Sequence, residues 1–291
     1  MMAGIIINPV AGPARGPVEV RVALARRALN EAGVDGEVIV SAGPGDARVR
    51  AAQLARDCCD LVVAWGGDGT VNEVASSLAF TGTALGIVPA GSGNGLAREL
   101  GVSMRPAAAL RAALAGRARP LDAGELDGRL FVNIAGIGFD AEVARRFNAR
   151  PPSRRGAWPY VTLTLGALWS YEPDRYQVTL DDERYDGRFL TIVLANGVQF
   201  GNRMRVAPEA RPDDGLLNAL LVDHRSIAGH LWRARHLLRD PTAAEGVVRR
   251  SVRAAVIEGT RPLACQIDGE SFTAGVRVEA RVHPGALTLR M

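Results

Sequence analysis

Apolar positions in the first part of the chain follow two alternating patterns. Short apolar runs such as residues 61–64 predict buried strands, and apolar residues at helical spacing, as in residues 18–32, predict helices between them. Buried strands that alternate with helices are typical of a doubly wound, mostly parallel sheet, whose ligands bind at the carboxyl ends of the strands. We therefore expect an α/β domain over residues 1–121. The predicted strands are 4–7, 37–40, 61–64 and 84–88, and the predicted helices are 18–32, 46–56, 71–78, 96–100 and 107–115.

The pattern changes near Leu121, where short apolar runs follow one another with few helices between them. This arrangement favours a mainly antiparallel β-sandwich over residues 122–291. The last strand, near residues 283–291, is a candidate to return to the first domain. Strands are predicted at 121–126, 130–134, 176–180, 189–194, 216–221, 254–258, 263–267, 276–282 and 287–290, and helices around 160–171 and 226–238.

A glycine-rich loop follows the predicted strand at residues 61–64 and leads into a predicted helix at Val71. A buried strand, a glycine turn and a helix start form a phosphate-binding design, because backbone N–H groups point at the anion. Asp68, in the middle of this loop, repels phosphate unless a cation lies between them. It therefore suggests a Mg²⁺-bridged nucleotide or a base beside the transferred phosphate. The alternative is a tight turn with Asp68 as a helix N-cap.

Composition narrows the choice of phosphate site. The chain has 291 residues and 35 basic against 31 acidic side chains, which gives a net charge of +4. None of the basic residues is lysine, and this excludes a Walker A loop and a protein-kinase β3 site, which both need one. Phosphate binding must then use backbone, arginine and metal. The modest charge, with no basic tail, argues against a nucleic-acid partner.

The cysteines and the apolar runs indicate a cellular compartment. Cys58, Cys59 and Cys265 are too few for a disulfide scaffold and are typical of small core residues in a reducing compartment. We find no signal peptide and no apolar stretch of ~18 residues, so we expect no transmembrane segment. The expectation is a cytoplasmic protein.

A series of motifs, in order along essentially the whole chain, resembles the diacylglycerol kinase catalytic-domain superfamily. This superfamily includes the bacterial soluble diacylglycerol kinases, related lipid kinases, and the sphingosine and ceramide kinases. The motifs are residues 8–12, 66–73, 89–98, 131–141, 195–197, Pro208, 213–217 and 268–270.

The resemblance implies a nucleotide site and a pair of catalytic acids. ATP would lie across three turns, Asp68 would anchor Mg²⁺, and Asp268 and Glu270 would come from the second domain to the same cleft. One of these two acids would deprotonate the acceptor hydroxyl, and we favour Glu270, with Asp268 second. The implied nucleotide contacts are Asn8, Pro9, Val10, Ala11, Gly12, Ser41, Gly66, Gly67, Asp68, Gly69, Thr70, Val71, Asn72 and Ser92.

The resemblance also implies a structural Mg²⁺ site, formed by the Asp214 carboxylate with the carbonyls of Arg211 and Leu216. Mixed carboxylate and carbonyl oxygens suit a hard cation. The simpler interpretation is a surface turn at residues 213–215, and a hairpin turn is the simpler interpretation of residues 268–269. We expect Asp140 to support the fold or to line the acceptor pocket.

Two segments combine arginine with tryptophan and suggest contact with a membrane. Residues 150–171 contain arginines, two tryptophans and two tyrosines, and residues 224–239 contain Trp232 among arginines. An enzyme that acts on lipid must contact the bilayer, and this composition is typical of an interfacial helix. The alternative is an ordinary amphipathic helix packed on the domain. We expect a lipid acceptor at a membrane surface, with transient contact at its inner face; a homodimer stays open.

The sequence thus predicts an ATP- and Mg²⁺-dependent kinase that phosphorylates a lipid hydroxyl, on diacylglycerol or a related lipid. NAD kinase is an alternative because it shares the Gly-Gly-Asp-Gly-Thr loop. A sphingosine-type kinase is another, because Gly95 stands where bacterial diacylglycerol kinases carry aspartate. A nucleotide- or lipid-binding protein without turnover is the non-enzymatic alternative.

Overall fold

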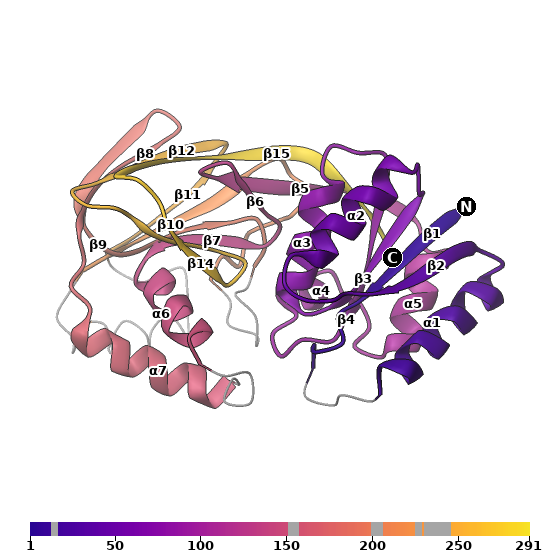
Figure 1. Ribbon diagram of the computed structural model, residues 1–291. Coiled ribbons are helices and arrows are strands. Elements are labelled where there is room, and N and C mark those ends of the chain that lie inside the picture. Colours follow the sequence, from indigo (N-terminus) through magenta and orange to yellow (C-terminus); the bar gives the residue numbers. More distant parts are fainter. Residues whose placement is uncertain (13–16, 151–156, 199–205, 225–228, 230–245) are drawn as a thin grey trace. The chain divides into compact units, whose positions relative to one another are not determined.

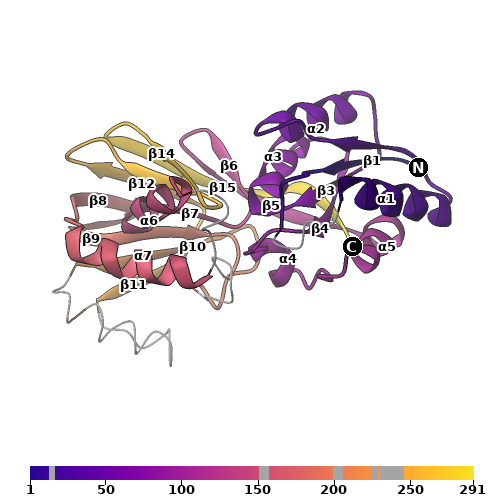
Figure 2. The ribbon, with the colours of Figure 1, turned by 60° about the horizontal axis from the view of Figure 1, so that its bottom comes forward.

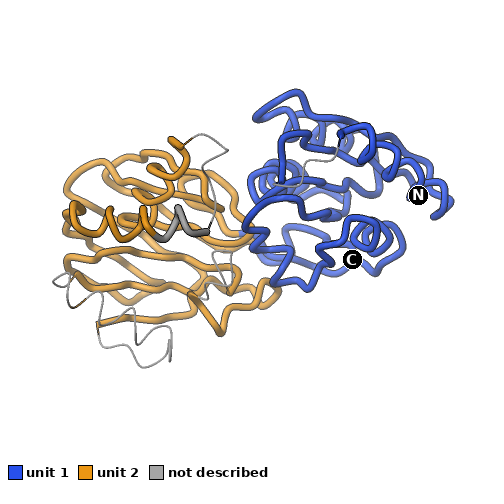
Figure 3. Tube along the Cα trace, turned by 90° about the horizontal axis from the view of Figure 1, so that it is seen from below, with its two compact units in different colours: residues 1–123, 201–203, 284–291 blue, residues 124–200, 204–283 orange. Residues whose placement is uncertain are grey.

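The computed structural model describes residues 1–12, 17–150, 157–198, 206–224, 229 and 246–291 (Figure 1). It divides into two compact units (Figure 3). Unit 1 contains residues 1–123 and 284–291, and unit 2 contains most of the described chain between 124 and 283. The helix predicted around residues 226–238 lies almost wholly outside the described residues.

Unit 1 is built on a parallel sheet whose strands have the order β4, β3, β1, β2. Ile5 of β1 lies opposite Val63 of β3 and Val38 of β2, and all six residues of β3 are buried. Helices α2 and α3 pack together on one face of the sheet, and α1 and α5 on the other (Figure 2). This confirms the doubly wound α/β domain. The strands are β1 (Met2–Ile7), β2 (Asp35–Val40), β3 (Leu61–Gly66) and β4 (Ala84–Pro89), and the helices are α1 (Val18–Ala32), α2 (Asp46–Arg56), α3 (Asp68–Leu78), α4 (Gly95–Glu99) and α5 (Pro106–Ala115).

Unit 2 is a mainly antiparallel β-sandwich, as predicted. Strand β9 pairs with β7, β8 and β10, all antiparallel, and the sandwich encloses a core of fully buried residues such as Val178 and Ile192. A second core lies beneath helices α6 and α7. The elements are β5 (Ala118–Leu126), β6 (Arg129–Phe131), β7 (Ile134–Gly138), α6 (Phe139–Asn148), α7 (Ala157–Ser170), β8 (Arg175–Leu180), β9 (Glu183–Ala195), β10 (Leu217–Asp223), β11 (Val247–Val252), β12 (Ala254–Gly259), β13 (Ala264–Ile267), β14 (Glu270–Thr273) and β15 (Arg277–Arg290).

Helix α6 was not predicted, and the predicted strand over residues 130–134 is divided between β6 and β7. The glycines explain the difference. Gly136 and Gly138 interrupt the apolar pattern, and Gly138 has a φ of 100°, a backbone conformation that starts α6 directly after β7. Because no polar loop separates β7 from α6, the sequence contains no sign of the boundary between the strand and the helix.

The two strands predicted at 276–282 and 287–290 form one continuous strand, β15. Its first half pairs with β12 in unit 2, and Leu289 near its end pairs in parallel with Leu85 of β4 in unit 1. Pro284 and Gly285 broke the apolar alternation at the point where the chain changes unit. The Gly285 N–H is donated to the buried Asp122 carboxylate at 2.7 Å, which keeps the backbone of the strand bonded there.

Among the described helices, none combines the length and the apolar character that a bilayer crossing requires.

Truncation of Leu289 tests how much unit 1 depends on β15. Its side chain is fully buried, so Leu289→Ala should lower the free energy of unfolding by about 2–5 kcal/mol, through lost apolar burial and a cavity. Urea unfolding measures this change. Val276→Ala, at a position half exposed to solvent, is the control and should change stability by less than about 0.5 kcal/mol. Equal stability of the two variants would contradict a core role for β15.

Candidate active site

The loop between β3 and α3 is short because the helix begins early. Helix α3 starts at Asp68, three residues before the predicted start at Val71, and Gly67 is its N-cap. Asp68 therefore does not cap its own helix. A side chain on Gly66 would lie 2.4 Å from Thr70 Oγ1, so only glycine fits where β3 turns into α3.

The Asp68 carboxylate joins this loop to the loop between β4 and α4. Its Oδ2 accepts the Asn94 N–H at 2.8 Å, and its Oδ1 accepts the Gly95 N–H at 2.7 Å. A Cβ on Gly91 would lie 2.7 Å from the Cα of Gly67, so the two loops approach each other glycine to glycine. Asp68 thus satisfies the N–H groups that begin α4, a helix distant in sequence from its own.

Burial shifts the pKa of Asp68. Removal from water raises the pKa of its carboxyl group above the ordinary aspartate value, against the opposing effects of the Gly95 and Asn94 N–H groups and the Arg98 charge. Arg98 is itself held at the loop, because its Nε donates to the Gly93 carbonyl at 2.9 Å.

The first loop, after β1, is tied to the loop between β3 and α3 through the Asn8 side chain. Asn8 Nδ2 donates to Thr70 Oγ1 at 2.9 Å, and Asn8 Oδ1 accepts the Val10 N–H at 3.0 Å. The buried Arg21 of α1 donates to the carbonyls of Asn8 and Ala11, each at 3.1 Å. The three turns predicted to bind nucleotide are therefore held together at the carboxyl edge of the unit 1 sheet.

The remaining predicted nucleotide residues differ in exposure. Ser41 is buried, and its N–H and hydroxyl both donate to the Ile7 carbonyl, at 2.9 and 3.4 Å. Val71 and Asn72 are buried in α3, whereas Ser92 is exposed. Pro9, Gly12, Gly67 and Gly69 are half-buried along the same edge. The predicted contacts therefore include both buried side chains and residues that a ligand could reach.

A cavity of about 470 Å³ lies beside the first and third loops. Ala11, Gly12 and Gly91 line it with backbone, and Arg21 and Arg98 line it with charge. Its apolar lining residues are Val20, Leu24, Trp65, Pro89, Ala90, Met104 and Pro106. Glycine backbone, guanidinium groups and an apolar wall together suit an anionic ligand with an apolar part.

The acidic motif of unit 2 forms the hairpin turn between β13 and β14. Asp268 and Gly269 have φ values of 47° and 90°, as expected for a two-residue hairpin. The Asp268 carboxylate accepts the N–H groups of Val132 at 2.9 Å, Asn133 at 3.0 Å and Ile134 at 2.9 Å. Asp268 therefore fastens the hairpin to the segment between β6 and β7.

Glu270 differs from Asp268 in its surroundings. It is the first residue of β14, it lies opposite Ile267, and its side chain is exposed to solvent. The two acids that the sequence placed together thus have different environments, one fastened by backbone donors and the other exposed.

The predicted metal residues lie on one turn before β10. Asp214 is exposed, and its Oδ1 accepts the Leu216 N–H at 3.0 Å. Arg211 pairs with the neighbouring Asp213 at 3.5 Å, not with Asp214. In the part of the chain that the structure describes, no group of three or more His, Cys, Asp or Glu side chains could hold a metal ion.

Arg21, Arg98 and Asn94 belong to the site but were not predicted as site residues. Arg21 left a signal, because it shares the buried face of α1 with Ala25 and Ala28, at helical spacing. A charged residue in an apolar stripe indicates a specific buried partner. The signal in the sequence for Asn94 is weaker. Asparagine is a residue type that tolerates a left-handed backbone, and Asn94 has this conformation, with a φ of 50°.

A doubly wound domain with three joined glycine turns, followed by a β-sandwich, defines a class of two-domain kinases. Residues 2–126 match the family described as "Diacylglycerol kinase catalytic domain", and residues 133–291 match "YegS C-terminal NAD kinase beta sandwich-like domain". The chain belongs to this diacylglycerol kinase family, and it is a lipid kinase that uses a nucleotide phosphoryl donor.

Named relatives agree with this assignment. A protein of Pseudomonas aeruginosa named "Probable lipid kinase YegS-like" is 35% identical, over 96% of this chain and 92% of its own. "Diacylglycerol kinase" of Bacillus subtilis is 29% identical, over 81% of this chain and 78% of its own. A crystal structure described as a diacylglycerol kinase of Bacillus anthracis has the same fold, with a TM-score of 0.76 at 21% identity over 99% of this chain and 96% of that one.

Replacement of Asp68 by asparagine tests the connection between the two loops. In Asp68→Asn an NH₂ group faces one of the two N–H donors, so we expect a loss of about 1–3 kcal/mol in the free energy of unfolding. Urea unfolding measures the loss, and Asp57→Asn, at an exposed position after α2, is the matched control. If the two variants are equally stable, Asp68 does not hold the loops together.

Proposed function

We propose that this protein transfers the γ-phosphoryl group of ATP to the hydroxyl of a lipid, diacylglycerol or a related acceptor, in a Mg²⁺-dependent reaction. The observation that carries the proposal is the joining of three glycine turns, the first to the second by Asn8 and the second to the third by Asp68. Backbone N–H groups held at one strand edge suit a phosphate chain, since phosphoryl transfer depends on positioning and charge neutralisation.

The nucleotide is proposed to lie along residues 8–12, 66–72 and Ser92, with Ser41 at the neighbouring strand end. Arg21 and Arg98 supply positive charge that, among the described residues, is hydrogen-bonded to backbone carbonyls and forms no ion pair. Mg²⁺ bound with the nucleotide would neutralise phosphate charge, and Asp68 is the acidic residue at these loops. Because its two oxygens each accept one N–H, water-mediated contact fits Asp68 better than direct coordination.

A second, structural Mg²⁺ is proposed at Asp214, with the carbonyls of Arg211 and Leu216. The donor chemistry fits. Asp214 is exposed, its Oδ1 is oriented by the Leu216 N–H, and its neighbour Asp213 takes the Arg211 guanidinium away. Carboxylate and carbonyl oxygens are the ligands that Mg²⁺ prefers.

Glu270 is proposed as the base that accepts the proton of the acceptor hydroxyl, and Asp268 as the residue that fixes the turn. Three backbone N–H groups bond to the Asp268 carboxylate, so its oxygens already serve to hold the turn. Glu270 is exposed and two residues away. This separation of roles follows from the surroundings of the two carboxylates.

Glu270→Gln tests the base with the fold preserved. The amide keeps the size of the side chain but accepts no proton, so kcat should fall by on the order of 10²- to 10⁴-fold with unchanged thermal stability. Glu279→Gln, the same change at an exposed position on β15, is the control. Activity of Glu270→Gln equal to that of the control would remove Glu270 from the mechanism.

The assay itself separates the candidate acceptors. Radiolabelled ATP, Mg²⁺ and mixed micelles of diacylglycerol, monoacylglycerol, ceramide or sphingosine should yield labelled phospholipid. Label in sphingosine phosphate alone would favour the long-chain base, and label transferred to NAD would overturn the lipid proposal. Bound ATP with no labelled product would favour a binding protein.

Contact with the cytoplasmic face of a membrane is proposed through helix α7. No charged residue occurs in α7, and its outer side exposes Leu165 at 50% and Trp169 at 73%. Its inner side packs on the core through Leu163 and Ala167, so α7 also packs on the domain. Exposed apolar and tryptophan side chains are typical of helices that lie in a bilayer interface.

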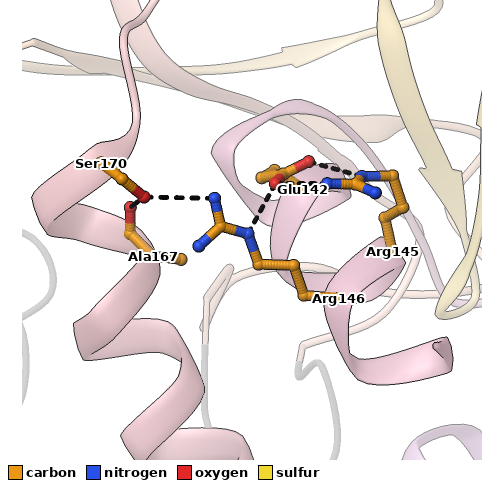
Figure 4. A network of polar contacts seen from close by, with 5 residues as sticks. All are labelled: Glu142, Arg145, Arg146, Ala167 and Ser170. Carbon is orange, nitrogen blue, oxygen red and sulfur yellow. Dashed lines mark hydrogen bonds and ion pairs between the residues drawn. The ribbon is translucent and has the colours of Figure 1, made fainter. Parts of the chain in front are cut away.

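Basic residues of α6 border this surface (Figure 4). Arg146 Nη2 donates to Ser170 Oγ at the end of α7 at 3.2 Å, and its Nε pairs with Glu142. Arg145 also pairs with Glu142 and is 64% exposed. Two guanidinium groups against one carboxylate leave positive charge beside the apolar face, which favours an anionic lipid surface.

Vesicle binding tests this surface. The double variant Leu165→Ser, Trp169→Ser should reduce co-sedimentation with phosphatidylglycerol vesicles several-fold, because both exposed apolar side chains are lost from the membrane-facing surface. Phe80→Ser, at a 66% exposed aromatic of unit 1, is the control. Binding that does not change in the double variant would contradict the proposal, and a change from dimer to monomer would assign the face to a second copy of the chain.

A further inference from the structure

A buried glutamine lies directly behind the Asp268-Gly269 turn. Gln266 is on β13 and is 2% exposed. Its Oε1 accepts the Gly269 N–H at 2.9 Å, and its Nε2 donates to Asp140 Oδ2 at 3.1 Å. The Gly269 N–H requires an oxygen, so the amide must direct its NH₂ toward Asp140. Asp140 is the acceptor that holds the NH₂ group in this orientation, with Oε1 facing the turn.

Asp140 is held in place from several directions. It lies in the first turn of α6, where the helix dipole favours a carboxylate, and its Oδ1 accepts the Thr191 hydroxyl at 2.7 Å. Gly136 pairs with Gln266 across the sheet, and a Cβ there would lie 1.5 Å from Asp140 Oδ2. The absence of a side chain at Gly136 is what leaves room for this carboxylate.

The other side of the turn is also bonded to α6. Asn148, the last residue of that helix, donates from Nδ2 to the Gly269 carbonyl at 2.8 Å. This carbonyl belongs to the peptide group that joins Gly269 to Glu270. The two peptide groups around Gly269 are therefore held, one by Gln266 and one by Asn148, and Glu270 follows immediately.

We propose that Asp140 and Gln266 are positioning residues, which orient the Asp268-Gly269 turn and so place the Glu270 carboxylate for proton transfer. The proposal rests on the role of Glu270 as base. Neither residue touches the acceptor in this account. Both act through the Gly269 N–H, in the peptide group that joins Asp268 to Gly269, and a shift of about 1 Å in a base costs on the order of 10²-fold in rate.

The first test removes the side-chain oxygen of Gln266 that accepts the Gly269 N–H. Gln266→Leu should lower kcat on the order of 10- to 100-fold with KM for ATP unchanged, since the nucleotide loops are in the other unit. Gln177→Leu, the same change at an exposed position of β8, is the matched control. Hydrogen exchange at the Gly269 amide should become faster in Gln266→Leu, which tests the geometry without any activity measurement.

The second test introduces a pH signature that the natural chain lacks. In Gln266→Glu the new carboxyl group can accept the Gly269 N–H and, while protonated, donate to Asp140, as glutamine does. When the pair loses this shared proton, two negative charges stand about 3 Å apart and repel. Activity should therefore be close to that of the natural chain at acid pH and fall as pH rises.

Three other titratable groups near this pair, one thiol and two tyrosine hydroxyls, have pKa values above the ordinary values for their types. Burial raises the pKa of the Cys265 thiol on β13 to about 12, and it raises the pKa values of the Tyr171 and Tyr176 hydroxyls. Burial also raises the pKa of Asp140, which favours retention of a shared proton in the Gln266→Glu pair. A loss of activity with rising pH that occurs in this variant and not in the natural chain is then assigned to residues 140 and 266.

The outcomes separate this proposal from the function on which it rests. If Glu270→Gln is inactive while Gln266→Leu has the kcat and the Gly269 exchange of the control, the positioning role is wrong and the base remains. If Glu270→Gln is active, the base assignment is wrong. A pH profile of Gln266→Glu that matches the natural chain would overturn the role of the Asp140–Gln266 pair.

Discussion

The carboxylate of Asp68, shared between two backbone N–H groups of another loop, is the interaction on which the nucleotide half depends. Glycine turns have no side chains with which to pack, so apolar contact cannot hold them together. A charged acceptor that binds Asn94 and Gly95 supplies the missing connection. Burial raises the pKa of this group, so its position in the loop costs free energy that the two N–H groups offset only in part.

Asp268 solves a similar problem in the other unit. It is also an aspartate in a turn beside glycine, and it also accepts backbone N–H groups from a segment remote in sequence. The carboxylates of both aspartates thus accept hydrogen bonds from the backbone. The motifs therefore combine two kinds of acidic residue. Asp68 and Asp268 hold the loops in shape, and Glu270 is the acid that we propose to take part in proton transfer.

Strong periodicity made much of the fold predictable, and the contacts between distant loops were not. Helix α1 spans residues 18–32 as predicted, because its apolar stripe is regular and Gly33 ends it. The partners of Asp68 could not be predicted, since they are backbone N–H groups and carry no residue-type signal. Gln266 was missed for another reason. A single glutamine in an apolar strand is not distinctive until α6, which the glycines concealed, brings Asp140 beside it.

The path of β15 has a consequence for the order in which the protein can mature. Residues 284–291 complete the sheet of unit 1, and Leu287 and Leu289 are buried there. On the ribosome these residues emerge only after all of unit 2 has been synthesised. N-terminal domains generally fold first during synthesis, yet unit 1 is complete only when residues 284–291, which follow unit 2 in the sequence, have been made. Until these residues have been made, the edge of β4 lacks the strand that covers it, and an unpaired strand edge favours pairing with a wrong strand.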